Sequence, residues 1–302
     1  MVVKEIPALH FKPVDDNFAK KQINSINVKK ATGVDNISPL LLKQASSIIA
    51  QPLTKLINKS MQQSIFPDDL KTAKVCPIHK KNSLLDKGNY RPGSVLPTVS
   101  KLFERAIHVQ VNEHFNHIFN PFLAAFRAGF SCQSTLIRIV EDWKSALDNN
   151  KYVGAILMDL SKAFDCLPHD LLLLKLKHYG VSDSALNLLD SYISDRKQCV
   201  KVGQYTSTFQ NIFKGVPQGS ILEPVLFNVF LNNIFGFVKH STLYNYADDN
   251  TVYRAHHDVT VLKTSLETDS KSLINWFHLN KMKANPDKCQ AIAIGKKANS
   301  LN

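Results

Sequence analysis

One short apolar run restricts the folds open to this chain more than any other feature. Residues 152–160 read YVGAILMDL, and polar residues bound the run on both sides. The run is too short for a typical buried helix, so it predicts a buried strand. Its apolar residues lead directly to Asp159, and the strand should therefore end on a carboxylate.

The segments after this strand alternate between helical and strand patterns. Pro168 opens the first helix, and Gly180 stands where a C-terminal cap belongs. The predicted order is two helices (168–179 and 182–193), a strand pair (198–203 and 207–213), a buried helix (220–235), two strands joined at 247–250, a long helix (262–277) and a last strand (289–295). This mixed order with an antiparallel hairpin predicts an α+β fold with helices packed on one face of the sheet.

The first half of the chain is predicted to be mainly helical. Ser38 can cap a helix that runs to about Ser64, with a break near Pro52. The other elements expected here are a short strand with a basic loop (71–81) and two amphipathic helices (98–119 and 134–150). We therefore divide the chain into two regions, residues 1–150 and residues 151–302.

The charge of the chain is positive and uneven. The formal net charge is +12, and residues 1–100 alone carry a net of +8. A basic first third suits a polyanion such as nucleic acid. A basic surface that only keeps the protein soluble would give the same balance, so charge alone leaves both interpretations open.

Several sequence features bear on the compartment. No apolar run reaches 18 residues, so no membrane span is expected. The N-terminal residues lack the basic-then-apolar layout of a signal peptide. Five cysteines are scattered without a C-x-x-C pair, which favours a reducing compartment and no zinc site. We expect an intracellular protein, in the cytoplasm or the nucleus.

Two adjacent carboxylates, Asp248 and Asp249, stand between the apolar segments TLY and TVY. Two carboxylates a few ångströms apart repel by roughly 4 kcal/mol at an effective dielectric near 20, so a proton or a cation must neutralise them. If the strand ending at Asp159 lies beside this hairpin, three acids surround one point and suit Mg²⁺. Alternatively the pair is only a polar hairpin tip, because Asp favours turns.

Two further segments are candidates for contact with phosphates. In GVPQGS, residues 215–220, Ser220 can cap the next helix, and exposed amides at a helix start suit a phosphate or a closely held base pair. An ordinary strand-to-helix turn has the same pattern. The cations Lys80, Lys81 and Arg91 lie in and after a basic loop, where they could grip a triphosphate.

Together these segments resemble the reverse transcriptases of retrotransposons that lack long terminal repeats, with the animal jockey-like lineages as the nearest likeness. AILMDLSKAFD, KGVPQGSILEPVLFN and LYNYADDNTV are similar to the central motifs, in the same order and spacing. CPIHKKNSLLDKGNYRPGSVLPTVSKLFER and FLAAFRAGFSCQSTL resemble the fingers motifs, and KKATGVDNIS resembles an extra upstream motif. The resemblance covers roughly residues 28–298.

The resemblance implies a right-hand polymerase with fingers within residues 1–150 and a palm within residues 151–302. It implies an RNA-directed DNA polymerase that adds deoxynucleoside triphosphates to the 3′ end of a DNA primer on an RNA template. The implied cofactor is Mg²⁺, as two ions about 3.5–4 Å apart, with Mn²⁺ as an alternative. No membrane partner is implied, and the sequence sets no oligomeric state.

The resemblance also implies roles for individual residues. Asp159, Asp248 and Asp249 match the metal-binding acids. Phe164 matches the bulky residue that leaves no room for a ribose 2′-hydroxyl, and Lys288 matches a basic residue that can protonate pyrophosphate. The residues implied to contact the incoming nucleotide or its triphosphate are Lys80 or Lys81, Arg91, Phe164, Gln218 and Gly219.

Two positions and the chain end depart from the family pattern. Glu223 stands where Gly is usual, and we expect it to strain the turn or to bury a charge, so that Glu223→Gly should raise stability or activity. Gly93 replaces a branched apolar residue and should leave its strand less well packed. A thumb and an endonuclease domain are not expected within these residues.

These departures leave three functions open. The chain is a reverse transcriptase domain, or a degenerate, catalytically weak or inactive copy that only binds nucleic acid, or a nuclease that uses its carboxylates to hold metal. The intact acids favour the first. Glu223, Gly93 and the missing thumb favour the second. The third gives no role to GVPQGS or to Phe164.

Overall fold

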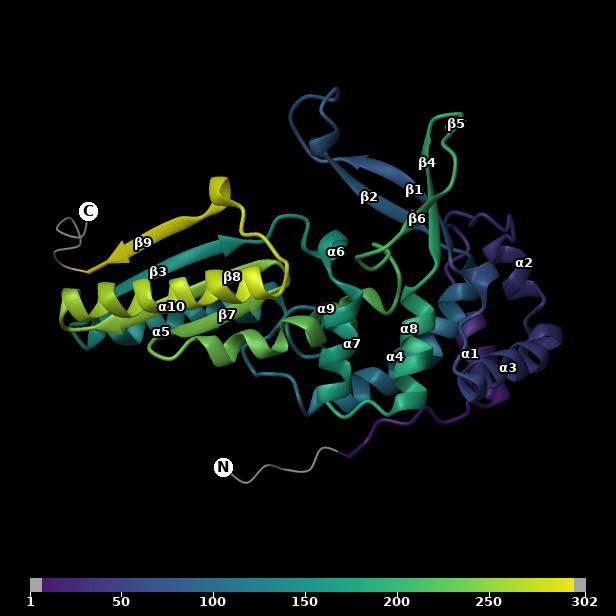
Figure 1. Cartoon of the computed structure of the whole chain (residues 1–302), viewed down its shortest axis with the longest axis horizontal. Coiled ribbons are helices and arrows are strands. Elements are labelled where there is room, and N and C mark those ends of the chain that lie inside the picture. Colours follow the sequence, from purple (N-terminus) through teal and green to yellow (C-terminus); the bar gives the residue numbers. More distant parts are fainter. Residues whose placement is uncertain (1–6, 296–302) are drawn as a thin grey trace. The chain divides into compact units, whose positions relative to one another are not determined.

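The computed structural model describes residues 7–295 (Figure 1). The chain divides into two compact units, and each is built from two separate segments. The first unit contains the chain up to His117 and residues 169–226. The second contains residues 118–168 and the chain from Phe227 onward. The predicted single boundary at residue 150 therefore differs from the division found in the structure.

Helices enclose the core of the first unit. They are α1 (Asp16–Asn24), α2 (Pro39–Gln44), α3 (Ser46–Gln63), α4 (Thr98–Asn116), α7 (His169–His178) and α8 (Asp183–Ile193). Ser38 caps α2 as predicted, but the break falls at Ala45, and Pro52 lies inside α3. In the core, the ring of Phe66 packs edge-on against Phe103 and Tyr192.

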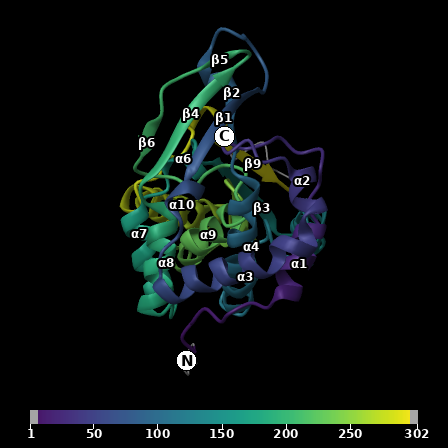
Figure 2. The same ribbon diagram turned by 90° about the vertical axis from the view of Figure 1, so that its right-hand side faces the viewer.

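A five-stranded sheet completes the first unit. Its strands are β1 (Thr72–His79), β2 (Tyr90–Val95), β4 (Arg196–Val202), β5 (Tyr205–Thr206) and β6 (Gln210–Ile212). β1 pairs in parallel with β4, and the other pairings are antiparallel. Figure 2 shows β1 beside β4. This long-range pairing joins the 169–226 segment to the first 117 residues and is the physical reason for the discontinuous unit.

The second unit is built on a four-stranded antiparallel sheet in the order β7-β8-β3-β9 (Figure 1). Its strands are β3 (Tyr152–Asp159), β7 (Thr242–Tyr246), β8 (Asp249–His256) and β9 (Gln290–Ile294). The helices of this part of the chain are α5 (Cys132–Asp148), α6 (Ala163–Cys166), α10 (Val259–Leu279) and α9 (Glu223–Leu231), which contains the boundary between the units. The predicted α+β class with an antiparallel sheet is confirmed.

The two long helices of this unit contact different faces of the sheet. A Cβ on Gly154 would lie 2.6 Å from Leu262 and 2.8 Å from Leu266, so Gly154 faces α10 and is small enough to admit its leucines. Neighbouring residues of a strand face opposite sides. Tyr253, which pairs with the adjacent Ala155, reaches Asp142 of α5. Helices therefore reach both faces, where one face was predicted.

No helix within residues 7–295 combines the length and the apolar character needed to cross a lipid bilayer.

Candidate active site

The pairing of β3 with β8 places two of the predicted acids opposite each other. Asp159 ends β3, Asp249 begins β8, and the two are direct partners in the antiparallel register. Asp248 lies in the two-residue turn just before Asp249. A strand and a hairpin that are about ninety residues apart in sequence therefore meet at their acidic ends, as the sequence predicted.

Two buried asparagines hold the acidic turn. Asn245 Nδ2 donates to the carbonyl of Ala247 at 2.8 Å and to Asn250 Oδ1 at 3.0 Å. Asn250 Nδ2 donates to the carbonyl of Asp248 at 3.2 Å. Ala247 has a positive φ of 56°, a conformation that costs an L-residue energy and that this bracing helps to hold. Sequence reasoning missed both asparagines, although the sequence does show an Asn on either side of the acid pair.

Backbone hydrogen bonds fix the end of β3 against two other segments. The amide of Leu160 donates to the carbonyl of Asp248 at 3.3 Å, and the amide of Asn285 donates to the carbonyl of Asp159 at 2.8 Å. Asn285 precedes the short 3-10 helix Pro286–Lys288. The segment after α10 is thereby held beside the acids.

Lys288 brings a cation to this cluster. Its Nζ lies 2.6 Å from Asp159 Oδ2, and the Asp159 side chain is only 12% exposed. The hydrogen bond to Asp159 raises the pKa of Lys288, and the negative charges of Asp159, Asp248 and Asp249 add to that rise. Lys288 is therefore held charged beside the acids, and its role as a proton donor stays a prediction.

The carboxyl of Asp249 lies among other negative charges. Partial desolvation raises the pKa of its carboxyl, and the neighbouring charges of Asp248 and Asp159 raise it further. Lys288 offsets only part of this effect. The site thus stores repulsion that an added cation would relieve.

The oxygen-only donor set around Asp159 and Asp249 fits a hard divalent cation such as Mg²⁺. Within residues 7–295, however, no three His, Cys, Asp or Glu side chains are grouped so as to hold a metal ion. The Asp159–Asp249 pair is assembled, and the predicted set of three acidic ligands is not preformed. The participation of Asp159, Asp248 and Asp249 as metal ligands therefore stays a prediction.

Phe164 lies in α6, just after β3. Its ring stacks on Phe227 with centroids 4.1 Å apart and meets Phe126 edge-on at 6.1 Å. Two aromatic neighbours restrict the rotamers of this half-buried side chain. The predicted role of this ring as a steric stop against a ribose 2′-hydroxyl stays a prediction.

The predicted turn GVPQGS lies in the first unit and is hydrogen-bonded to residues of other elements of that unit. The amide of Ser94 in β2 donates to the carbonyl of Gln218 at 2.9 Å. His169 Nε2 lies 2.8 Å from the carbonyl of Gly215. Gly219 has a φ of +102°, which favours glycine. Gln218 and Gly219 therefore stand on a fixed backbone.

Glu223 stabilises this turn, contrary to the sequence expectation. Its Oε2 accepts a 2.6 Å hydrogen bond from the amide of Gly219, and its own amide donates to Ser220 Oγ at 3.0 Å. The side chain is half-buried rather than enclosed. It lies in the first turn of α9, where a negative charge interacts favourably with the helix dipole. The predicted strain and buried, unpaired charge are absent at this residue.

Glu104 of α4 also stabilises the end of the GVPQGS turn, and sequence reasoning missed this residue. It is fully buried, its Oε2 accepts from the amide of Ile221 at 2.6 Å, and its Oε1 accepts from Ser100 Oγ at 2.9 Å. Burial raises the pKa of Glu104, while these hydrogen bonds and the buried Arg196 favour the charged form. Nothing in the periodicity of α4 distinguishes this Glu from a solvated one.

Arg91 and Lys80 lie on the β1–β2 hairpin of the first unit. Arg91 is exposed and pairs in register with Ile78, and the amide of exposed Lys80 donates to the carbonyl of Asn89 at 2.8 Å. A Cβ on Gly93 would meet Ile78 Cδ1 at 2.9 Å, so the side chain of Ile78 fills the space that a branched residue would use. The strand is not left with a gap at Gly93.

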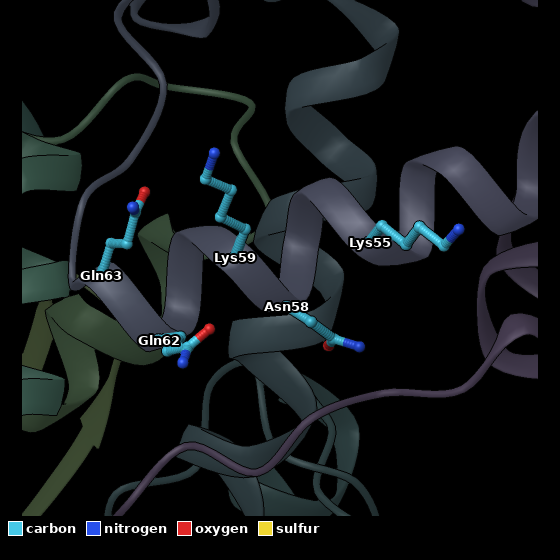
Figure 3. Close-up of a pocket in the computed structure, with 5 residues that line it drawn as sticks. All are labelled: Lys55, Asn58, Lys59, Gln62 and Gln63. Carbon is cyan, nitrogen blue, oxygen red and sulfur yellow. The ribbon is translucent and has the colours of Figure 1, made fainter.

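A hollow of about 670 Å³ runs along α3, away from the predicted site residues in sequence. Figure 3 shows its polar lining: Lys55, Asn58, Lys59, Gln62 and Gln63. The side chain of Asn58 bonds both the amide and the carbonyl of Val14, which identifies it as a structural residue. This hollow contains none of the predicted catalytic groups.

Comparison with known proteins identifies the family of the chain. Residues 78–300 match the family described as reverse transcriptase (RNA-dependent DNA polymerase), and the chain belongs to that family. It is similar to the probable RNA-directed DNA polymerase from transposon BS of Drosophila melanogaster, with 29% identity over 93% of this chain and 32% of the relative. It is also 26% identical to the RNA-directed DNA polymerase from mobile element jockey of the same species, over 93% of this chain and 32% of the relative.

A solved structure supports the fold. Apo telomerase from Candida tropicalis, truncated from its C-terminal domain, superposes with a TM-score of 0.55 at 16% identity, over 83% of this chain and 56% of that chain. At this identity the likeness concerns the fold alone. The chain spans about a third of the length of the curated relatives that it matches.

Proposed function

We propose that this chain is the polymerising part of a retroelement reverse transcriptase and adds deoxynucleotides to the 3′ end of a DNA primer on an RNA template. The observation that carries the proposal is the cross-strand pair of Asp159 and Asp249, with Lys288 bonded to Asp159. The second unit is assigned as the palm and the first as the fingers. The protein would act in the cytoplasm or nucleus.

Asp159, Asp249 and Asp248 would hold two Mg²⁺ ions, with Mn²⁺ as an alternative. Bound there, the ions would supply activation of the attacking primer oxygen and neutralisation of the leaving phosphate. Asp159 and Asp249 supply the carboxylate oxygens, and the repulsion stored at Asp249 favours their binding. Asp248 would join Asp159 and Asp249 as the third carboxylate ligand when the ions bind.

The remaining residues have roles that follow from their chemistry. Lys288 carries a proton beside Asp159 and can give it to departing pyrophosphate. The stacked ring of Phe164 blocks the space of a ribose 2′-hydroxyl. Arg91, with Lys80, supplies cations for the triphosphate. Gln218 and Gly219 contact the nucleotide and template from a braced turn.

Primer extension on an RNA template with Mg²⁺ and deoxynucleotides tests the proposal. The chain should extend the primer, and Asp159→Ala and Asp248→Ala should abolish extension without a loss of folding by circular dichroism. A folded wild-type chain that binds primer–template without extending it supports the degenerate alternative instead. Extension that survives both changes would overturn the assignment of the acids. Cutting of labelled DNA with Mg²⁺ and no nucleotides would support the nuclease.

A further inference from the structure

Asp142 of α5 accepts hydrogen bonds from two tyrosines on one carboxylate oxygen. The hydroxyl of Tyr244 donates to Asp142 Oδ2 at 2.6 Å, and the hydroxyl of Tyr253 donates to the same atom at 2.7 Å. Tyr244 lies in β7 and Tyr253 in β8, the two strands of the hairpin that carries the acid pair. A single side chain of α5 therefore holds both strands of that hairpin.

The two tyrosines are neighbours on one face of the hairpin. Tyr244 pairs in register with Thr251, and residues two apart in a strand share a face, so Tyr253 is the diagonal neighbour of Tyr244. Their rings stack with centroids 6.0 Å apart and planes at 19°. The hydroxyls are thereby brought to one point, where the Asp142 carboxylate meets them.

Both phenols keep their protons and can donate to Asp142 at neutral pH. Desolvation raises the pKa of Tyr253 to about 12, and the hydrogen bond to Asp142 and the negative charge of Asp142 add to that rise. The same three causes, in the same order, raise the pKa of Tyr244. Hydrogen bonds to an ionised acceptor are stronger than those between neutral groups, so this contact holds the strands more firmly than two ordinary bonds would.

Tyr244 is also fixed from the side by the segment before α5. The ring of Phe122 meets the Tyr244 ring edge-on at 4.9 Å, and the Arg138 guanidinium lies 4.6 Å from the centroid of the Phe122 ring. The amide of Asn245, the next residue of β7, donates to the carbonyl of Phe122 at 3.1 Å. Asn245 is one of the two asparagines that hold the acidic turn, so a chain of direct contacts leads from Asp142 to that turn.

Backbone pairing alone leaves part of the hairpin geometry open. Pairing with β3 fixes the register of β8, but the twist between neighbouring strands varies over roughly 10–35° in proteins. Asp248 lies in the turn beyond Tyr246 and Asp249, the last pair of the hairpin, so its position depends on that twist. A contact that ties both strands to one helix restricts the twist.

We propose that Asp142 is a positioning residue of the acid site, which sets the twist of the hairpin through Tyr244 and Tyr253 and so places Asp248 and Asp249 for a divalent cation. The inference rests on the proposed function, in which these acids bind Mg²⁺. It extends that function to a residue of α5 that acts through the two tyrosines.

Primer extension across a Mg²⁺ titration tests this role. Asp142→Ala should raise the Mg²⁺ concentration for half-maximal rate by about tenfold or more, because loss of a residue that orients metal ligands typically costs that much. Tyr244→Phe/Tyr253→Phe should have the same effect, and adding Asp142→Ala to it should change little further. Asp142→Asn keeps an acceptor and should restore most of the wild-type Mg²⁺ dependence.

Asp258→Ala is the matched control for a loss of stability. Asp258 caps α10 by accepting from the amide of Thr260 at 2.7 Å, beyond the end of β8 that lies away from the acids. Its removal should lower the melting temperature in EDTA and leave the half-maximal Mg²⁺ concentration unchanged. If Asp142 were purely structural, Asp142→Ala would behave in the same way.

The rise of the melting temperature between EDTA and Mg²⁺ is a second readout that needs no catalysis. Asp142→Ala should lose most of the rise shown by wild type, and Asp258→Ala should keep it. Should Asp142→Ala fail to fold, the double Tyr244→Phe/Tyr253→Phe variant gives both readouts in its place.

The outcomes separate this role from the proposed function. A wild-type chain that melts higher in Mg²⁺ but extends no primer defeats the proposed function, while loss of the rise in Asp142→Ala still supports the positioning role. Extension with a wild-type Mg²⁺ dependence in both Asp142→Ala and Tyr244→Phe/Tyr253→Phe overturns the positioning role alone. A wild-type chain that neither extends a primer nor melts higher in Mg²⁺ overturns both.

Discussion

Lys288 Nζ and Asp159 Oδ2 are 2.6 Å apart, a contact between an ammonium that is largely exposed and a carboxylate that is largely buried. The contact joins the two chain segments of the second unit, and its residues are 129 positions apart in sequence. An ammonium in this place partly neutralises the acids, so it competes with any metal ion that would use the same oxygen. If a metal ion binds there, we expect its binding to be coupled to release of Lys288 from Asp159.

Lys288→Met should lower the maximal rate of primer extension by about a hundredfold, because a positioned acid contributes roughly that much or more. The same change should reduce the Mg²⁺ concentration needed for half-maximal rate, because the competing ammonium is gone. Extension rates across a Mg²⁺ titration measure both effects. Lys271→Met on the exposed side of α10 is the control. An unchanged rate would remove Lys288 from the mechanism.

Asp249→Asn should stabilise the metal-free protein while abolishing extension. Because folding raises the pKa of Asp249, the folded state holds this proton more tightly than the unfolded state. The associated stability is present below the unfolded pKa of about 3.9 and is lost as pH rises through the higher folded pKa. Melting temperatures in EDTA should therefore fall less for Asp249→Asn than for wild type as the pH rises across that range.

Mg²⁺ should raise the melting temperature of the wild type and leave that of Asp249→Asn unchanged. An Asp249→Asn variant that melts at a lower temperature than wild type at every pH would contradict the repulsion at Asp249.

Phe164→Val should relax discrimination against ribonucleotides by at least tenfold, because removal of the stacked ring opens the space that a 2′-hydroxyl needs. The ratio of kcat/KM for a deoxynucleotide to that for its ribonucleotide measures the effect. Phe126→Val removes the edge-on neighbour of Phe164 and leaves the ring itself, so it should change the ratio less. Should the two variants discriminate equally well, Phe164 is not the steric stop.

Glu223→Gly should lower the free energy of unfolding by about 1–2 kcal/mol, because it removes the hydrogen bond to the Gly219 amide and places Gly in the first turn of α9. This reverses the expectation from sequence. Urea titration measures the change, and Glu223→Gln, which keeps an acceptor at the same reach, should lose less. A glycine variant more stable than wild type would restore the original view of strain at this position.

Glu104→Leu should cost about 3–5 kcal/mol of stability, because it leaves the Ile221 amide without its acceptor and buried Arg196 without a facing charge. Glu104→Gln keeps an acceptor and should cost less. If Glu104 positions the turn, the folded Gln variant should also show a higher KM for deoxynucleotides, with kcat changed less. An unchanged KM would make Glu104 a purely structural residue.

Local patterns in the sequence predict much of this architecture. The apolar run before Asp159, the hairpin at Asp248 and Asp249 and the amphipathic pattern of α10 each specify one element through short-range periodicity. The meeting of Asp159 with the hairpin followed from placing the two elements in one sheet. These are features in which side-chain spacing alone decides which face is buried.

Long-range pairings and single contacts are where prediction from sequence stops. The parallel pairing of β1 with β4 leaves no mark in either strand, since both are short and mixed in polarity. Glu104 has the composition of a surface residue, and only its partner 117 residues away explains its burial. Glu223 was misjudged for the same reason, because the hydrogen bond from Gly219 depends on the path of the turn and not on composition.

The first unit is built from two separate chain segments, and this affects its folding during synthesis on the ribosome. A nascent chain that has emerged only as far as residue 150 still lacks β4, and its β1 has one unpaired edge. The ribosome must release the chain as far as the end of β4 at Val202 before that edge is covered. Until then the half-built sheet offers chaperones, or neighbouring nascent chains, a strand with which to pair.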